Sequence, residues 1–348
     1  MATYYSDIFE VLRQLEKERE NRQKFLKKIP DVRAQLYRNL VFPELETFIP
    51  IEWIDGSTIL TPGNQTLFLY RGQVQEFPTC IPNIYRGDPT IYDLFEARLK
   101  QREFEKVIQK HPAIYDISSS GIHISFTGLA QHYGFRTEFL DVTSDPLVAA
   151  FFAVCCYSAS EEKYLPVGEQ KEQGVFMKTL SSVYTMNPMN VPKLQPIGLH
   201  PFPRPGNQKA YAVQLECGEN YSAHKMLFHQ TKEGSEYIYD LFEGGTKLFP
   251  SDPLKEKADE ILGGRVFSRE VADIICAQDD FSEQPDFYVE ELGFEITDSS
   301  PYEFTAEELN QFQKEWEKEG KANFKKQIGP TYLTYSNPSL QRTATSLK

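Results

Sequence analysis

A buried strand followed closely by a buried helix is the feature that most constrains the fold of this chain. Residues 139–142 are apolar except for Asp141, and three polar residues and Pro146 separate them from an apolar run at residues 147–157. Pro146 directly precedes that run, and the first turn of a helix tolerates proline well. The pattern predicts a strand, a polar turn, and then a helix from residue 146 to residue 157.

The overall composition indicates a globular protein. The 40% hydrophobic and 13% aromatic content is enough for a substantial buried core. A net charge of −13 repels phosphate, so broad non-specific binding of nucleic acid is not expected. A local basic cleft is still compatible with this net charge. The five cysteines show neither a disulfide framework nor a metal-binding spacing, which favours a reducing compartment. We therefore expect a cytoplasmic protein.

No segment of the sequence resembles a targeting signal or a membrane span. The first residues lack a basic stretch followed by an apolar one, and the apolar run at residues 147–157 is too short to cross a bilayer. We expect no membrane association.

Helices are predicted near both ends of the chain. Ile8, Leu12 and Leu15 fall on one face of a helix that Ser6 can cap. Thr305 stands three residues before a glutamate, the spacing of a capping box, and an apolar face follows it.

Several common catalytic signatures are missing from the sequence. It contains no GxxxxGK[ST] phosphate loop, no HExxH or CxxC metal motif, and no GxSxG nucleophile elbow. The six histidines are scattered along the chain. We expect no bound metal.

Three segments of the sequence resemble the FRG domain family. The first is Tyr-Arg-Gly-Gln at residues 70–73, with a second arginine at Arg86. The second is a long block at residues 129–153, which contains Gln-His-Tyr-Gly, Leu-Asp-Val-Thr and Ala-Ala-Phe-Phe-Ala in the family's order. The third is weaker and consists of Arg204 and Gln208 ahead of an expected strand.

The extent of this resemblance suggests how the chain is divided. It covers roughly residues 63–262, which we expect to form the FRG domain. Residues 1–62 are then an N-terminal helical extension, and residues 263–348 are a C-terminal extension that contains a helix and ends in a mobile tail.

A more distant similarity links the same segments to mono-ADP-ribosyltransferases. Residues 70–72 resemble the Tyr-Arg-Gly strand of those enzymes, and residues 142–144 resemble their Ser-Thr-Ser element. This similarity implies an α+β fold with an ADP-ribosyltransferase-like mixed sheet as its core, flanked by helical N- and C-terminal segments. It also implies NAD, or a related nucleotide, as substrate or ligand.

The resemblance assigns roles to two groups of residues. Arg71 can bind a pyrophosphate through two parallel hydrogen bonds, because the guanidinium presents a planar fork that lysine lacks. Thr143 and Ser144 can bind a ribose or order the site through their hydroxyl groups. Asp141 lies between apolar neighbours, so we expect it to be paired with Arg71 or with a backbone amide. The remaining candidates for binding the nucleotide are Gly72, Gln73, Arg86 and Tyr133.

His132 and Gln208 are the other candidates for a catalytic role. A histidine at a helix end is as compatible with capping as with a site role. Gln208 falls where the transferases carry a glutamate that stabilises the cationic transition state, and an amide has no charge to do this. We therefore expect slow or absent turnover, and expect Gln208→Glu to raise it.

Two functions of different classes are compatible with these residues. The first is an NAD-dependent ADP-ribosyltransferase or NAD glycohydrolase, with a protein, nucleic acid or small molecule as target, which by analogy acts as a toxin or defence effector. The second is a non-catalytic module that binds a nucleotide or a partner. The sequence does not determine the oligomeric state.

Overall fold

The computed structural model describes residues 2–26, 47–53, 56–63, 68–181, 193–278 and 281–329. Across these residues, seven strands form one mixed sheet in the order β1-β11-β8-β4-β5-β10-β9, in which β1 runs parallel to β11 and the other neighbours are antiparallel. The strands are β1 (Thr3–Tyr5), β4 (Phe68–Gln73), β5 (Phe139–Thr143), β8 (Gln173–Leu180), β9 (Leu194–Pro196), β10 (Ala210–Gln214) and β11 (His224–His229).

Three further pairs of short strands lie outside this sheet, at β2–β3, β6–β7 and β12–β13. Their bounds are β2 (Phe48–Glu52), β3 (Thr58–Pro62), β6 (Cys155–Ser158), β7 (Lys163–Pro166), β12 (Val266–Ser268) and β13 (Glu295–Thr297).

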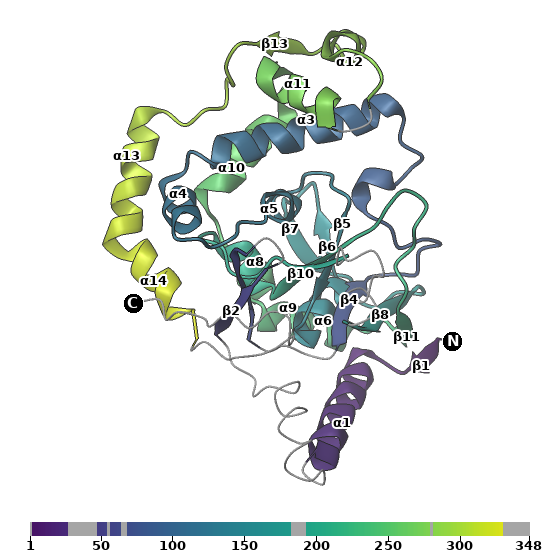
Figure 1. Cartoon of the computed structure of the whole chain (residues 1–348). Coiled ribbons are helices and arrows are strands. Elements are labelled where there is room, and N and C mark those ends of the chain that lie inside the picture. Colours follow the sequence, from purple (N-terminus) through teal and green to yellow (C-terminus); the bar gives the residue numbers. More distant parts are fainter. Residues whose placement is uncertain are drawn as a thin grey trace.

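Helices cover the sheet and form a separate cluster beside it (Figure 1). Helix α6 packs across β4 and β8, with α1 and α9 against α6. Helix α3 packs with α10, α11 and α12 above the sheet in the view of Figure 1, and α13 packs on α4. The α-helices are α1 (Ile8–Leu26), α3 (Ile91–Ile108), α4 (Pro112–Ser119), α5 (Phe126–His132), α6 (Pro146–Val154), α8 (Pro203–Asn207), α9 (Lys232–Leu241), α10 (Pro253–Gly263), α11 (Arg269–Gln278), α12 (Pro285–Leu292), α13 (Ala306–Glu315) and α14 (Lys321–Lys326).

The strand, turn and helix expected from residue 139 onward are present as β5 and α6. Asp145 caps α6 by accepting a hydrogen bond of 2.8 Å from the Leu147 amide, and Pro146 occupies the first turn. The helix is shorter than predicted, because it ends at Val154 and Cys155 begins β6. An apolar run does not by itself distinguish a helix from a strand. Here its last residues form β6, because they pair with β7.

The N-terminal segment joins the main sheet. Strand β1 pairs with β11, and the buried side chains of Ile8, Val11 and Leu15 on α1 pack in the same cluster as α6. Ser6 does not cap α1 through its side chain as expected. Instead Asp7 accepts a hydrogen bond of 2.7 Å from the Glu10 amide.

The C-terminal segment packs against the helical cluster. The capping box at Thr305 and Glu308 is present as predicted, and Phe312 and Trp316 are buried against this cluster. The expected mobile tail lies outside the described residues. Within the described residues, no helix is both long and apolar enough to span a membrane.

Candidate functional site

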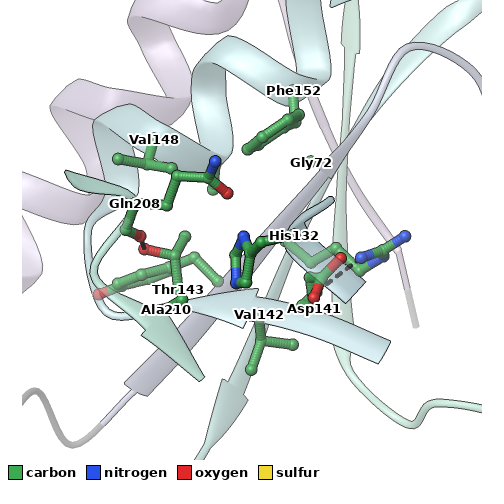
Figure 2. A pocket seen from close by; sticks show the side chains of 12 residues that line it. Gly72, His132, Asp141, Val142, Thr143, Val148, Phe152, Gln208 and Ala210 are labelled. Carbon is green, nitrogen blue, oxygen red and sulfur yellow. Dashed lines mark hydrogen bonds between the residues drawn. The ribbon is translucent and has the colours of Figure 1, made fainter. Parts of the chain in front are cut away.

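A pocket of about 180 Å³ opens in the middle of the sheet, where β4 and β5 diverge. Strand β4 pairs with β8 from Phe68 to Gln73, but within the described residues it pairs with β5 at a single position, Tyr70 opposite Thr143. The lining residues come from β4, α5, β5, α6 and the start of β10 (Figure 2). They are Tyr70, Arg71, Gly72, His132, Asp141, Val142, Thr143, Val148, Ala149, Phe152, Gln208 and Ala210.

Arg71 spans the gap between the two diverging strands. Its Nη1 donates a hydrogen bond of 2.6 Å to the main-chain oxygen of Asp141, while its buried Nε has no hydrogen-bond partner among the described residues. A guanidinium has five N–H donors, so this bond leaves most of them for other acceptors. Arg71 therefore lines the pocket and retains donors for an anionic ligand.

Asp141 presents a carboxylate to the pocket. Its Oδ2 accepts a hydrogen bond of 3.1 Å from Gln131 Nε2, and the Gln131 carbonyl in turn accepts a bond from the Thr137 hydroxyl. Its Oδ1 is buried and has no partner among the described residues. The expected partner, Arg71, binds the main-chain oxygen of this residue and not its carboxylate.

His132 lines the pocket at the end of α5, and Figure 2 shows it between Asp141, Thr143 and Gln208. The side chain is buried, and its Nε2 has no hydrogen-bond partner in the described part of the chain, although the Gln208 side chain is close enough to raise its pKa slightly. Burial lowers the pKa of His132, and the negative charge of Asp141 opposes this shift. Because the net shift is downward, the imidazole is neutral near pH 7 and can either donate or accept one hydrogen bond.

Thr143 fixes the turn that carries Gln208. Its hydroxyl donates to the Gln208 main-chain oxygen at 2.7 Å and accepts from the Asp145 amide at 3.0 Å. The next residue, Lys209, adopts a left-handed conformation with φ of 46°, and β10 begins directly after it. Of the two roles predicted for the Thr143 hydroxyl, this geometry matches ordering of the site.

Gln208 reaches the pocket, but its amide is already engaged. The Nε2 atom donates a hydrogen bond of 3.1 Å to the main-chain oxygen of Leu248, and the residue is buried. A glutamate here would place a carboxylate against that carbonyl, so the structure argues against the expected gain in turnover from Gln208→Glu.

Gly72 is required by helix packing. A Cβ atom at this position would lie 1.9 Å from the Ala149 main-chain oxygen and 2.5 Å from the Ala153 amide nitrogen. The backbone of β4 and the helix α6 therefore approach too closely for any side chain. This close approach brings Ala149 and Phe152 to the pocket wall.

Four other predicted residues, Gln73, Arg86, Tyr133 and Ser144, are not part of the pocket lining. Gln73 donates to Cys80 Sγ at 3.8 Å, and Ser144 is buried with its amide bonded to the Lys209 oxygen. Arg86 lies at the surface and donates through Nε to the Ile81 oxygen. Partial desolvation of its guanidinium lowers the pKa of Arg86, and the positive charge of nearby Arg71 lowers it further.

Tyr133 faces away from the pocket, into the cluster around α3. Its ring centroid lies 4.6 Å from the Arg204 guanidinium carbon, and Arg204 Nε is 3.3 Å from Asp252 Oδ2. Burial of the Tyr133 hydroxyl raises its pKa well above the usual value. This buried group holds the start of α8 against the start of α10.

Several residues that line the pocket were not predicted as site residues from the sequence, and two of them bear on its chemistry. Phe152 contributes an aromatic wall, and Asp141 was expected as a paired structural residue. The alternation of β5 was the available signal for Asp141, because Phe139, Asp141 and Thr143 share one face of a strand. Two glutamates near the expected site, Glu138 and Glu216, do not line the pocket: Glu138 pairs with Arg98 at 2.5 Å, and Glu216 is exposed.

Comparison with protein families supports part of the expected resemblance. The family model of the FRG domain matches residues 66–162. The chain carries an FRG domain. The match includes both strands that flank the gap, together with Arg71, His132 and Asp141, but it ends before Gln208 and is shorter than the expected 63–262. Comparisons with curated proteins and with solved structures give no significant match.

Proposed function

We propose that this pocket binds the nicotinamide–ribose end of NAD. The protein would then cleave the bond between nicotinamide and ribose and transfer ADP-ribose to an acceptor or to water. The observation that carries this proposal is the convergence of Arg71, His132 and Gln208 on one pocket at the gap between β4 and β5. These residues lie far apart in the sequence, and each offers hydrogen-bonding groups suited to a nucleotide.

The size of the pocket favours one end of a dinucleotide. Pockets that bury a drug-sized ligand occupy about 300–1,000 Å³, and this one occupies about 180 Å³. The phosphates would then lie at the rim, where Arg71 retains free donors and Arg86 adds positive charge nearby. A planar ring would contact Phe152, and the neutral His132 would accept or donate one bond to a ribose hydroxyl.

The test is an assay of NAD consumption by the purified chain, which reads both released nicotinamide and transfer of labelled ADP-ribose to protein, DNA and RNA. Wild-type protein should release nicotinamide, and Arg71→Ala should not. Arg13→Ala, at an exposed position on α1, is the matched control and should behave as wild type. Absence of release by wild-type protein under all acceptor conditions would contradict the catalytic proposal.

A second candidate function is a nucleotide-binding module without catalysis. It is favoured by the engaged amide of Gln208, which stands where the similar transferases carry a glutamate. Such a module would be stabilised against heat by NAD or ADP-ribose in proportion to ligand concentration and would leave NAD intact. Thermal unfolding with and without ligand, run beside the nicotinamide assay, separates the two functions.

A further inference from the structure

We infer that Asp141 supplies the negative charge that stabilises the cationic nicotinamide–ribose unit in this pocket, and that Gln131 is the residue that positions it. This inference rests on the proposed function and names the residue that would carry its electrostatic step. Among the described residues that line the pocket, Asp141 is the one with a carboxylate.

The carboxylate of Asp141 is held in a defined orientation. Gln131 Nε2 holds Oδ2 at 3.1 Å, and Thr137 fixes the other end of the same amide by donating to its oxygen. Thr137 is fully buried, and its hydroxyl also accepts from the Phe139 amide at 3.2 Å. These hydrogen bonds fix the carboxylate through Oδ2 and leave Asp141 Oδ1 without a hydrogen-bond partner among the described residues.

The Asp141 carboxylate forms no direct ion pair among the described residues, although its charge interacts with nearby Arg86. Arg71 is bonded to the main-chain oxygen, and Gln131 is a neutral donor. A buried carboxylate oxygen without a donor destabilises the folded protein, and this penalty falls when a cation binds beside it. Oδ1 is buried in this way and belongs to a residue that lines the pocket.

NAD carries a positive charge on the part of the molecule that would enter this pocket, the nicotinamide ring. When the bond between ribose C1′ and the ring nitrogen breaks, the electron pair stays on the nitrogen, nicotinamide leaves neutral, and the positive charge moves to C1′ and the ring oxygen of the ribose. A lone pair from an acceptor hydroxyl or from water then forms the new bond to C1′, and the acceptor loses its proton. A carboxylate beside the ribose stabilises the cation both before and after cleavage.

The test compares the affinities of NAD⁺ and NADH, which differ in the charge of the nicotinamide ring, by calorimetry. Wild-type protein should prefer NAD⁺ by on the order of tenfold, as expected for one charge facing another across a protein site. Asp141→Asn should abolish the preference, while its affinity for ADP-ribose, which lacks the ring, stays within about threefold of wild type. Gln131→Met should reduce the preference for NAD⁺ over NADH but leave the affinity for ADP-ribose unchanged. A general structural defect would instead weaken the binding of ADP-ribose as well. Glu216→Gln removes an exposed carboxylate and should change neither measurement.

The outcomes separate this inference from the function on which it rests. If wild-type protein binds neither NAD nor ADP-ribose, the proposed function fails and the inference fails with it. If ADP-ribose binds and Asp141→Asn keeps the full preference for NAD⁺, the proposed function survives and the role of Asp141 is overturned. Equal affinity of wild-type protein for the two redox forms would likewise overturn the role of Asp141.

Discussion

Arg71 Nη1 lies 2.6 Å from the main-chain oxygen of Asp141, to which it donates a hydrogen bond across the gap between β4 and β5. Among the described residues, main-chain pairing between these strands is confined to Tyr70 and Thr143, so the guanidinium spans a gap that the sheet leaves open. The same side chain therefore helps to hold the two walls of the pocket and keeps further N–H groups for a ligand.

Gly72→Ala should strongly destabilise the protein. The added methyl group would lie 1.9 Å from the Ala149 oxygen, so β4 and α6 would have to separate. Overpacking of this kind costs about 3 kcal/mol. Urea unfolding at pH 7.5 measures the change in the free energy of unfolding.

Gly263→Ala provides the matched control. A methyl group there meets no heavy atom of the described residues within 4 Å, so the change should be within about 1 kcal/mol and on the stabilising side. If both substitutions changed the free energy of unfolding equally, α6 would not pack as closely against β4 as the structure shows.

The protein should lose stability in mild acid because of His111. Burial lowers the pKa of this histidine from 6.5 to about 4, and its Nδ1 caps α4 by accepting from the Ala113 amide. Since the folded pKa is below the unfolded one, the stabilisation is complete above pH 6.5 and is lost as the pH falls toward 4. The loss from this residue between pH 7.5 and pH 5 is about 2 kcal/mol.

Unfolding by urea at these two pH values, in wild-type protein and in His111→Asn, checks this prediction. Asparagine also caps helices but does not titrate, so the variant should be less stable at pH 7.5 and should lose less stability on acidification. An identical loss in both proteins would mean that His111 does not titrate as proposed.

Local patterns in the sequence predicted the elements of the fold better than their relation to one another. The strand β5, the helix α6 up to Val154 and the capping box of α13 depend on neighbouring residues, and α13 begins where Thr305 predicts. The pairing of β1 with β11 depends on a partner more than 200 residues away. No local pattern predicts that contact.

Some of the residues proposed from the sequence lie together in one pocket, whereas others do not. Arg71, His132, Thr143 and Gln208 all line the pocket, because the motifs that contain them lie at the ends of elements around the gap. Tyr133 follows His132 directly, yet it faces the helical core, since neighbouring residues at a helix end point in different directions. The orientation of the Asp141 carboxylate follows from its hydrogen bond to Gln131 and from the bond between Gln131 and Thr137, which sequence spacing does not encode.

Gln208→Glu should not increase the release of nicotinamide. It removes the donor to the Leu248 oxygen and places a charge against that oxygen, which costs about 1–3 kcal/mol of stability. Gln208→Met removes the donor without adding charge, so it should be less harmful than the glutamate. Thermal unfolding and the nicotinamide assay on both variants test this, and faster release by Gln208→Glu would revive the prediction made from the sequence.

Titration of ADP-ribose into the purified protein, followed by calorimetry, tests the central claim that this pocket binds a nucleotide through Arg71. Wild-type protein should bind one molecule, and Arg71→Ala should weaken the affinity by at least about tenfold, as expected for the loss of hydrogen bonds between charged groups. Arg71→Lys should be nearly as weak, because an ammonium cannot reproduce the planar fork. Arg13→Ala should bind as wild type does. Absence of binding by wild-type protein, or full affinity in Arg71→Lys, would contradict the account.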